Sequence, residues 1–411
     1  MKANYPYISR LVQNKLKEIF ELFPVVVISG ARQVGKSTLL ENVFDKHIQR
    51  IVFDPLMDVE NAKQDPDLFL KTHRTPLILD EIQYAPEIIS SIKRRLDKDR
   101  TPGQYLITGS QQWGIIKDLS ESLAGRAVFL DLDGFCLNEL SQRAPKTTWL
   151  EKWLSGRMDF EHLSLKNNLF EQIWTGFLPE TNFLPKKYLH TFFQSYVRTY
   201  IERDVRQMSE INDFTLFTRF YKLCSCLSAQ EINYNEIGRD IGVTPQTASR
   251  WLSLLKASFQ WFEISSYQGN TIKRISEKPK GYFHDTGLIC WALAVSSPQA
   301  ISSHPSLGAL FETFVVNDIR KQCQALSTKP NLYHWRSHGG AEVDLIIEMD
   351  GIFYPIEIKA KSHPTKKDTR GITAFRKTYP NLNIGKGLVV APADSFYAIN
   401  SNDYVLFYDA C

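Results

Sequence analysis

One segment constrains the fold of this chain more than any other: a glycine-rich run between an apolar strand pattern and a helical pattern. The run consists of Gly30, Ala31, Arg32, Gln33, Val34, Gly35, Lys36 and Ser37, and Thr38 follows it. It fits the template G-x-x-x-x-G-K-[ST], in which glycines let successive backbone N–H groups turn inward around phosphate oxygens. The helix that is expected to begin near Lys36 adds a positive N-terminal dipole. These residues are therefore predicted to bind the phosphates of ATP.

Two side chains of the loop have separate expected roles, and two acids complete the site. Lys36 is expected to reach the β- and γ-phosphates, and the Ser37 hydroxyl is expected to ligate Mg²⁺. The apolar run 76–79 leads into Asp80 and Glu81, and acids in that place face the crevice where open α/β sheets bind ligands. Asp80 is predicted to join the Mg²⁺ shell, and Glu81 to act as general base. Capping of a helix N-terminus is the alternative role of both acids.

From about residue 10 to 140, short β-rich runs alternate with helical patterns, which is typical of a parallel α/β sheet. The candidate strands are Val25–Ser29, Arg50–Phe53, Leu77–Asp80, Tyr105–Thr108 and Val128–Asp131. A strand lies between the one that leads into the loop and the one that ends at Asp80. The fold class is therefore predicted as α/β, beginning with a P-loop domain.

The loop, the inserted strand, the acid pair and a polar strand end at 104–110 resemble the AAA+ ATPases. The resemblance implies that a polar residue at that strand end senses the γ-phosphate. Thr108 and Ser110 are both candidates, and capping of the next helix is the alternative for either one. It also implies that Arg126 reaches the nucleotide of a neighbouring subunit, since a guanidinium can pair with two phosphate oxygens. A structural salt bridge is the alternative for Arg126.

Residues 231–256 have a helix-turn-helix pattern, in which Gly242 turns the chain and Thr244 and Pro245 start the second helix. The inward residues are expected to be Ile237, Ile241, Trp251, Leu252 and Leu255. Runs near 262–264 and 282–284 are candidate strands of a wing, with Lys273, Arg274, Lys278 and Lys280 at its tip. In one interpretation Gln246, Thr247, Ser249 and Arg250 contact a DNA major groove. In the other the module only packs between its neighbours, and Glu231, Glu236 and Asp240 weaken its basic face.

The C-terminal part carries acids and a lysine in a nuclease-like order. Glu312 lies on an expected helix, Asp344 on a strand, and Glu357 and Lys359 on the next strand, where residues two apart share a face. This arrangement is similar to the PD-(D/E)xK nucleases, in which carboxylates hold Mg²⁺ or Mn²⁺ for phosphodiester hydrolysis. A basic stretch suited to phosphate backbones follows at 361–377. The alternative is that this domain has inherited the nuclease fold but now only binds its partner and no longer cleaves.

Nearly the whole chain resembles a prokaryotic family of AAA+ ATPases with a C-terminal domain of unknown function. The motifs that carry this resemblance are 30–37, 79–81, 107–110, 123–126, 200–205, 343–344 and 356–359. The expected domains are a P-loop ATPase domain at 1–145, a helical lid at 146–215, a winged-helix-like domain at 216–297 and a nuclease-like domain at 298–411. A polar, turn-forming linker is expected at 296–306.

Composition limits the classes of function without selecting one. The net charge of +4 permits contact with double-stranded DNA but does not argue for it. No apolar run reaches the length of a membrane span and no secretory signal is evident, so a cytoplasmic protein is expected. The leading hypothesis is an ATP-driven switch acting on DNA. The rival is an ATP-dependent protein-interaction module that cleaves nothing, and the number of subunits in an ATP-dependent homo-oligomer stays open.

Overall fold

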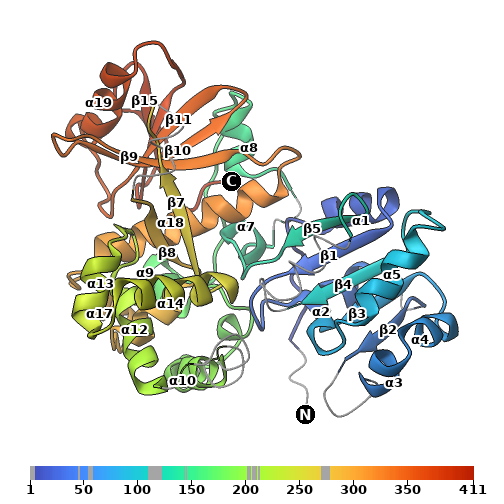
Figure 1. The fold of residues 1–411 in the computed structure, drawn as a ribbon. Helices are drawn as coiled ribbons and strands as arrows, with labels where there is room; N and C mark the ends of the chain where they lie inside the picture. Colours follow the sequence, from blue (N-terminus) through green and yellow to red (C-terminus); the bar gives the residue numbers. More distant parts are fainter. Residues whose placement is uncertain are drawn as a thin grey trace.

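The computed structural model describes residues 5–44, 47–53, 59–109, 123–142, 144, 146–200, 205, 211, 213–269 and 278–411. The chain builds two sheets, one near each end, with a largely helical region between them (Figure 1). None of the helices in these ranges is long and apolar enough to cross a bilayer.

The first sheet is parallel, with the strand order β2-β3-β4-β1-β5. Its strands are β1 (Val25–Ser29), β2 (Gln49–Val52), β3 (Leu77–Asp80), β4 (Tyr105–Gly109) and β5 (Ala127–Asp131), close to the expected bounds. In space, β4 lies between β1 and β3. Because all five strands run the same way, the loops that follow β1, β3 and β4 meet at one edge of the sheet.

Helices cover both faces of this sheet, which explains why its central strands are apolar throughout. Val26 and Ile28 belong to one core, and Val25 and Val27 to the other, as the alternation of side chains along a strand requires. The helices of the first part are α1 (Gln13–Leu22), α2 (Lys36–Val43), α3 (Val59–Gln64), α4 (Pro66–Thr72), α5 (Ile88–Leu96) and the 3-10 turn η1 (Ile82–Tyr84). The expected α/β fold with a P-loop sheet is confirmed.

The middle of the chain is mainly helical. Its helices are α7 (Leu137–Leu140), α8 (Trp149–Leu154), α9 (Leu169–Thr175), α10 (Leu189–Tyr200), α12 (Phe214–Cys226), α13 (Tyr234–Ile241), α14 (Pro245–Ala257), α16 (Thr286–Ala292) and α17 (Pro298–Ile301), with 3-10 turns η2 (Glu180–Asn182) and η3 (Lys186–Tyr188). In the helix-turn-helix, Gly242 ends α13 with φ 84° and the Thr244 side chain accepts a bond from the Thr247 N–H. The residues expected to face inward there are buried.

The second sheet is mixed and has the order β14-β15-β13-β11-β10-β9-β7-β8-β6, with β12 paired to β11. Its strands are β6 (Gln230–Glu231), β7 (Trp261–Ser266), β8 (Lys280–Phe283), β9 (Asn331–Arg336), β10 (Glu342–Met349), β11 (Ile352–Ile358), β12 (Asn383–Ile384), β13 (Gly387–Ala391), β14 (Tyr397–Ala398) and β15 (Asp403–Phe407). The helices α18 (Leu307–Ala325) and α19 (Arg370–Thr378) and the 3-10 turn η5 (Lys366–Thr369) accompany it.

This sheet crosses the expected domain boundary at 297/298. β7 pairs with β8 on one side and with β9 on the other, so the wing-like hairpin is part of the C-terminal sheet (Figure 1). The expected linker at 296–306 contains α17, and its Ile301 is fully buried in the main core. Ile301 was missed because the residues around it are polar and favour turns. The two C-terminal parts pack as one unit.

Candidate functional site

The P-loop follows β1, and its backbone needs glycine. Gly30 has φ 154° and Gly35 has φ 93°, and a Cβ at Gly30 would collide with the carbonyl oxygen of Leu132. Gln33 also has a positive φ, of 62°. These conformations let the loop curl over the N-terminus of α2, where free N–H groups favour an anion.

Lys36 lies inside the curl of this loop. Its side chain is buried, and Nζ donates hydrogen bonds of 2.9 Å to the carbonyl oxygens of both Gly30 and Ala31. The ammonium group is thus held beside the same amides that are expected to surround the phosphates. A phosphate in the loop would offer it a stronger, charge-assisted acceptor than a neutral carbonyl.

Asp80 stands next to Ser37 at the carboxyl edge of the sheet. The Ser37 hydroxyl donates to Asp80 Oδ2 over 2.8 Å, and the Thr108 hydroxyl donates to Asp80 Oδ1. Burial acts to raise the pKa of Asp80, but the hydrogen bonds from Thr108, Arg50 and Ser37 hold that pKa below its usual value. A carboxylate that stays charged beside a serine hydroxyl has the chemistry of a Mg²⁺ site.

Arg50 is a member of this site that the sequence analysis missed. Its guanidinium on β2 pairs with Asp80 Oδ2 and with Glu41 on α2. The same aspartate oxygen therefore receives both Ser37 and Arg50. A basic residue directly before the apolar Ile51 and Val52 of this edge strand was the available signal, but only the pairing of β2 with β3 brings Arg50 to Asp80.

Glu81 follows Asp80 and leaves the strand in the left-handed region, with φ 59°. Its N–H donates to the Thr108 hydroxyl over 3.1 Å, and its carboxylate accepts a bond from the Gln83 side chain. A non-glycine residue in this conformation costs about 1 kcal/mol and is typical of active sites.

The structure places Thr108 between the two acids, fully buried at the end of β4. Ser110, the other sensor candidate, lies outside the described residues. Thr108 thus has a positioning contact to each acid, and its sensor role stays a prediction.

Arg126 lies at the opposite edge of the sheet from the P-loop. It directly precedes β5, whose first residue Ala127 is paired with Val25, the first residue of β1. Its guanidinium forms an ion pair with Asp97 at the end of α5. Arg126 therefore cannot reach a nucleotide in its own loop, and contact with a neighbouring subunit stays a prediction.

The four C-terminal candidates meet at one place. Lys359 Nζ lies 3.1 Å from Asp344 Oδ2 and 2.8 Å from Glu357 Oε2, and the Ile358 N–H donates to Asp344 Oδ2 over 2.8 Å. Burial and the negative charge of Asp344 raise the pKa of Glu357. Glu312 on α18 completes the group, and burial together with Asp344 raises the pKa of Glu312 to about 7.

Lys280 belongs to this centre and not to the tip of a wing, where the sequence analysis placed it. Its Nζ lies 2.5 Å from Glu312 Oε1 and 3.7 Å from Asp344 Oδ1. The Tyr282 hydroxyl donates to Glu312 Oε1 over 2.7 Å. Of the other expected tip residues, Lys278 is exposed, and Lys273 and Arg274 lie outside the described residues. The error arose because a lysine near a hairpin was assumed to face solvent.

The carboxylates of this centre are not arranged as a metal site. Within the described ranges, no group of three or more His, Cys, Asp or Glu side chains is placed to hold a metal ion. Each carboxylate is instead paired with Lys280 or Lys359. The residue types suit Mg²⁺ or Mn²⁺, but in this arrangement two ammonium groups stand among them, so the expected second metal is not shown.

Comparison with known proteins supports the first of these two sites. Residues 22–141 match the model of the AAA domain family. The match covers the P-loop, Asp80 and Glu81. The match supports an ATPase-like AAA domain in this part of the chain. Residues 166–299 match a domain of unknown function (DUF8612), and residues 307–410 match another (DUF4143); neither match assigns a nuclease activity.

Full-length relatives and solved structures add little about function. The chain is 26% identical over 387 residues to the uncharacterized proteins Rv2008c of Mycobacterium tuberculosis and Mb2031c of Mycobacterium bovis, covering 94% of this chain and 80% of each relative. The Walker-type ATPase PABY2304 of Pyrococcus abyssi is similar at 14% identity and a TM-score of 0.42, over 68% of this chain and 94% of that one. The Thermotoga maritima RuvB Holliday junction branch migration motor is similar at 16% identity and a TM-score of 0.30, over 61% and 88%.

The P-loop of the ATPase domain is supported from behind by a residue near the N-terminus. The buried Arg10 donates to the carbonyl oxygen of Val34 over 2.9 Å and to that of Asp133 over 2.5 Å, and it lies 3.0 Å from the carboxylate of Glu139. Tyr196 of α10 donates to the carbonyl oxygen of Arg32 over 3.4 Å. The loop is therefore in contact with both the sheet and the helical region, and sequence reasoning found neither contact.

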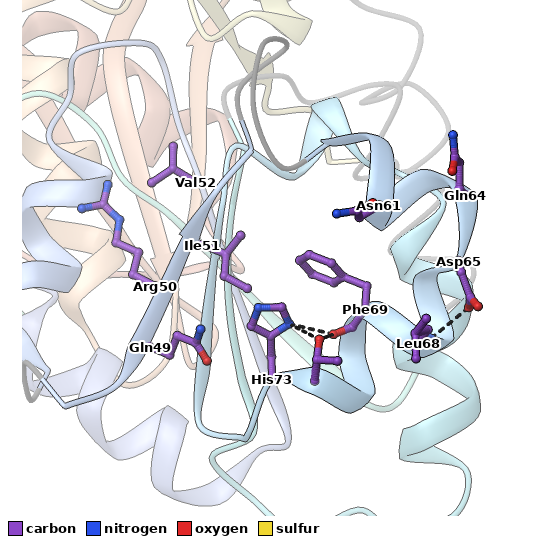
Figure 2. A pocket seen from close by; sticks show the side chains of 11 residues that line it. Gln49, Arg50, Ile51, Val52, Asn61, Gln64, Asp65, Leu68, Phe69 and His73 are labelled. Carbon is purple, nitrogen blue, oxygen red and sulfur yellow. Dashed lines mark hydrogen bonds between the residues drawn. The ribbon is translucent and has the colours of Figure 1, made fainter.

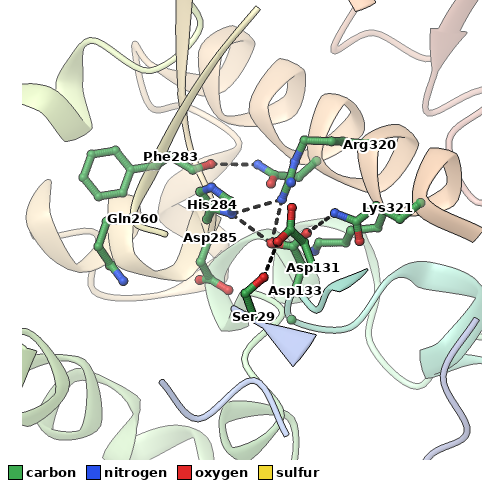
Figure 3. A network of polar contacts seen from close by, with 12 residues as sticks. Ser29, Asp131, Asp133, Gln260, Phe283, His284, Asp285, Arg320 and Lys321 are labelled. Atoms are coloured by element: carbon green, nitrogen blue, oxygen red, sulfur yellow. Dashed lines mark hydrogen bonds and ion pairs between the residues drawn. The ribbon is translucent and has the colours of Figure 1, made fainter. Parts of the chain in front are cut away.

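A polar network joins the ATPase sheet to α18 (Figure 3). Asp133, just after β5, accepts from His284 over 2.9 Å, from Arg320 over 2.7 Å and from Gln324 over 2.8 Å. Burial would raise the pKa of Asp133, but Arg320 and His284 hold it well below its usual value. Next to it, Lys321 donates to the carbonyl oxygen of Phe135 over 2.7 Å. The carboxyl edge of the ATPase sheet is thus in direct contact with the C-terminal part of the chain through Asp133.

A wide hollow of 830 Å³ lies between β2 and the helices α3 and α4, and Arg50 is one of its lining residues (Figure 2). Its lining includes Ile51, Leu68, Phe69 and His73, and His73 is turned back onto the Phe69 carbonyl oxygen. The charged residues of its lining are Arg50 and Asp65, and Arg50 is already paired with Asp80, so the size of the hollow alone does not make it a reaction site.

Proposed function

We propose that this chain is a Mg²⁺-dependent ATPase whose cycle of binding and hydrolysis drives a conformational switch. The observation that carries the proposal is the contact between Ser37 and Asp80 at the mouth of a P-loop. The loop amides and Lys36 would hold the phosphates, and Ser37 and Asp80 would hold Mg²⁺. The ion supplies neutralisation of the phosphate charge when it is bound.

The remaining roles follow from position. Glu81 takes a proton from the attacking water, and Thr108 keeps Asp80 and Glu81 in place. Arg50 pairs with Asp80, and a divalent cation held by Ser37 and Asp80 would compete with that guanidinium for the carboxylate. Arg126 would act on the nucleotide of a second copy, which would make hydrolysis depend on assembly.

Two variants test the ATPase. Lys36→Ala is expected to abolish nucleotide binding in calorimetry, because the loop loses the buried ammonium group that is proposed to bind the phosphates. Glu81→Gln keeps the size of the side chain and is expected to bind ATP normally while phosphate release falls about 100-fold or more. Unchanged phosphate release from Glu81→Gln would remove it as the base, and binding by Lys36→Ala would contradict the site as a whole.

We further propose that the switch acts on DNA. An open hollow of 810 Å³ on the helix-turn-helix is lined by polar residues that suit base edges and phosphates, among them Gln246, Ser249, Arg250 and Lys278. Two of the nearby acids are already paired, Glu231 with Arg336 at 3.7 Å and Glu263 with Lys256 at 2.6 Å. The negative charge of those two acids is thereby partly compensated near this face.

The rival proposal is a regulatory module whose C-terminal centre is inactive. Incubation with plasmid DNA and Mn²⁺, with Asp344→Ala beside the unmodified protein, separates the two. Cleavage by the unmodified protein alone supports a nuclease centre. Cleavage by both preparations, or by neither, supports the regulatory module.

A further inference from the structure

The C-terminal centre contains more charge than the nuclease-like motif accounts for. Three carboxylates and two ammonium groups gather from a hairpin strand, a long helix and two further strands. The group consists of Lys280 on β8, Glu312 on α18, Asp344 on β10, and Glu357 and Lys359 at the end of β11. The side chains of Asp344 and Glu357 are 3% exposed, and that of Lys280 is 10% exposed.

Such a cluster is a poor way to stabilise a fold. Removing charges from water costs several kcal/mol for each ion, and apolar residues of similar volume often serve as well or better. Buried groups of this kind, with partners that shift one another's pKa values, therefore mark functional sites more often than other buried positions do.

The two lysines divide the oxygens of Asp344 between them. Lys359 and the Ile358 N–H contact Oδ2, whereas Lys280 is on the side of Oδ1. Lys280 also contacts the Oε1 atom of Glu312. Its ammonium group thus lies between the two carboxylates from α18 and β10, where a metal ion shared by them would have to lie.

The position of Lys280 is set by the sheet. Its backbone pairs with Ile264 on β7 and with Glu231 on β6, and its side chain is directed from the hairpin into the centre. The Tyr282 hydroxyl, on the same strand, holds the Glu312 oxygen that Lys280 contacts. The hairpin therefore delivers a positive charge to the centre as part of the fold.

We propose that Lys280 is a tethered cation that occupies the divalent-metal position between Glu312 and Asp344, so that a metal ion and Lys280 compete for these carboxylates. This inference rests on the nuclease-like role that the sequence predicts for the centre and that the plasmid experiment above tests. It adds a form of regulation to that role: the centre binds Mg²⁺ or Mn²⁺ only when the Lys280 ammonium group moves out from between Glu312 and Asp344.

The test is Mn²⁺ binding, measured by calorimetry and by the electron paramagnetic resonance signal of free Mn²⁺. All proteins carry Asp80→Asn, which removes the metal ligand of the ATPase site. Lys280→Met and Lys280→Gln are expected to bind Mn²⁺ about tenfold more tightly or better than the parent, since one competing unit charge is gone. Lys280→Arg keeps the charge and is expected to bind as weakly as the parent.

Two controls locate the effect. Lys278→Met removes the same charge from an exposed position of the same hairpin and is expected to leave Mn²⁺ affinity unchanged. Adding Asp344→Asn to Lys280→Met is expected to abolish the gain. Thermal unfolding checks that each variant is folded. If either Lys280→Met or Lys280→Gln does not fold, the other still tests the inference.

The outcomes distinguish this inference from the proposed function. If the parent already binds Mn²⁺ through Asp344 and neutral variants bind no more tightly, the competition is wrong while the metal centre stands. If neither the parent nor any folded Lys280 variant binds Mn²⁺, the competition and the nuclease-like role both fail. A gain that Lys278→Met reproduces would show a general charge effect and would also overturn the inference.

Discussion

At the scale of single residues, the ATPase site depends on side chains that hold other side chains. Asp80 receives bonds from Ser37, Thr108 and Arg50, and all three come from elements other than β3. Thr108 also accepts the N–H of Glu81. The Thr108 hydroxyl thus holds the carboxylate of Asp80 and the backbone of Glu81 at once, and a small error in the position of catalytic groups can lower the rate by a large factor.

Replacing Thr108 tests this positioning role. Thr108→Val keeps the shape but removes the bond to Asp80 and leaves the Glu81 N–H without its acceptor. We expect the rate of phosphate release to fall about tenfold or more, with ATP affinity in calorimetry changed much less, because the loop that binds phosphates is untouched. Thr108→Ser retains the hydroxyl and is the matched control. Equal losses of rate and affinity in Thr108→Val would instead indicate a disrupted fold.

At the scale of elements, the helix-turn-helix and its hairpin contribute to both the proposed DNA-binding face and the carboxylate centre. The exposed face of α14 borders an open hollow, while β8 carries Lys280 into the carboxylate centre. Lys278 and Pro279 line that hollow and directly precede Lys280 on the same hairpin. A polymer seated against this face would therefore touch the hairpin that places a charge in the centre.

The DNA proposal predicts a salt-dependent affinity at this face. Arg250→Ala and Lys278→Ala are each expected to weaken binding of duplex DNA and to lower the slope of log affinity against log salt by about 1. Fluorescence anisotropy with a labelled duplex at several salt concentrations measures both quantities. Lys187→Ala, at an exposed site on η3, is the matched control. An affinity that ignores salt, or a control that behaves like Arg250→Ala, would rule out this face as the DNA contact.

At the scale of the whole molecule, the ATPase sheet and the C-terminal part are joined by a polar interface. Asp133 binds His284, Arg320 and Gln324, and the backbone N–H of Leu137 donates to Asp318 over 2.8 Å. The main core is also continuous, from α1 and β1 to the last strand of the chain. A change in the P-loop therefore has packed, polar contacts through which it can bias the C-terminal part.

Removing Asp133 tests how much this interface contributes. Asp133→Ala leaves the Arg320 guanidinium buried without its acid, and we expect the free energy of unfolding to fall by about 3 to 5 kcal/mol. Urea unfolding followed by tryptophan fluorescence measures the loss. In the double variant Asp133→Ala/Arg320→Met the loss is expected to be smaller than the sum of the two single losses. Additive losses would mean that the two side chains are not energetically coupled.

Several features of the molecule could be predicted from sequence because their signals are local. The P-loop, the two acids at the end of β3 and the two helices around Gly242 each occupy a short run, in which spacing and residue type directly reflect backbone geometry. The strand bounds of the first sheet followed for the same reason, since a buried parallel strand is a continuous apolar run. Glu312, Asp344, Glu357 and Lys359 were also predicted to share a centre, and the structure brings them together.

Other features were decided only by the tertiary structure, because they join residues far apart in the chain. Arg50 reaches Asp80 through the pairing of β2 with β3, and Arg10 reaches the P-loop from the N-terminal segment. Lys280 was expected at a solvent-exposed tip. Because β7 pairs with β9, the hairpin joins the C-terminal sheet, and the Lys280 side chain points toward the carboxylates of the centre. Sequence spacing specifies which groups are near one another along the backbone. Which charges neutralise one another in the interior depends on strand pairing and burial, and these exist only once the chain is folded.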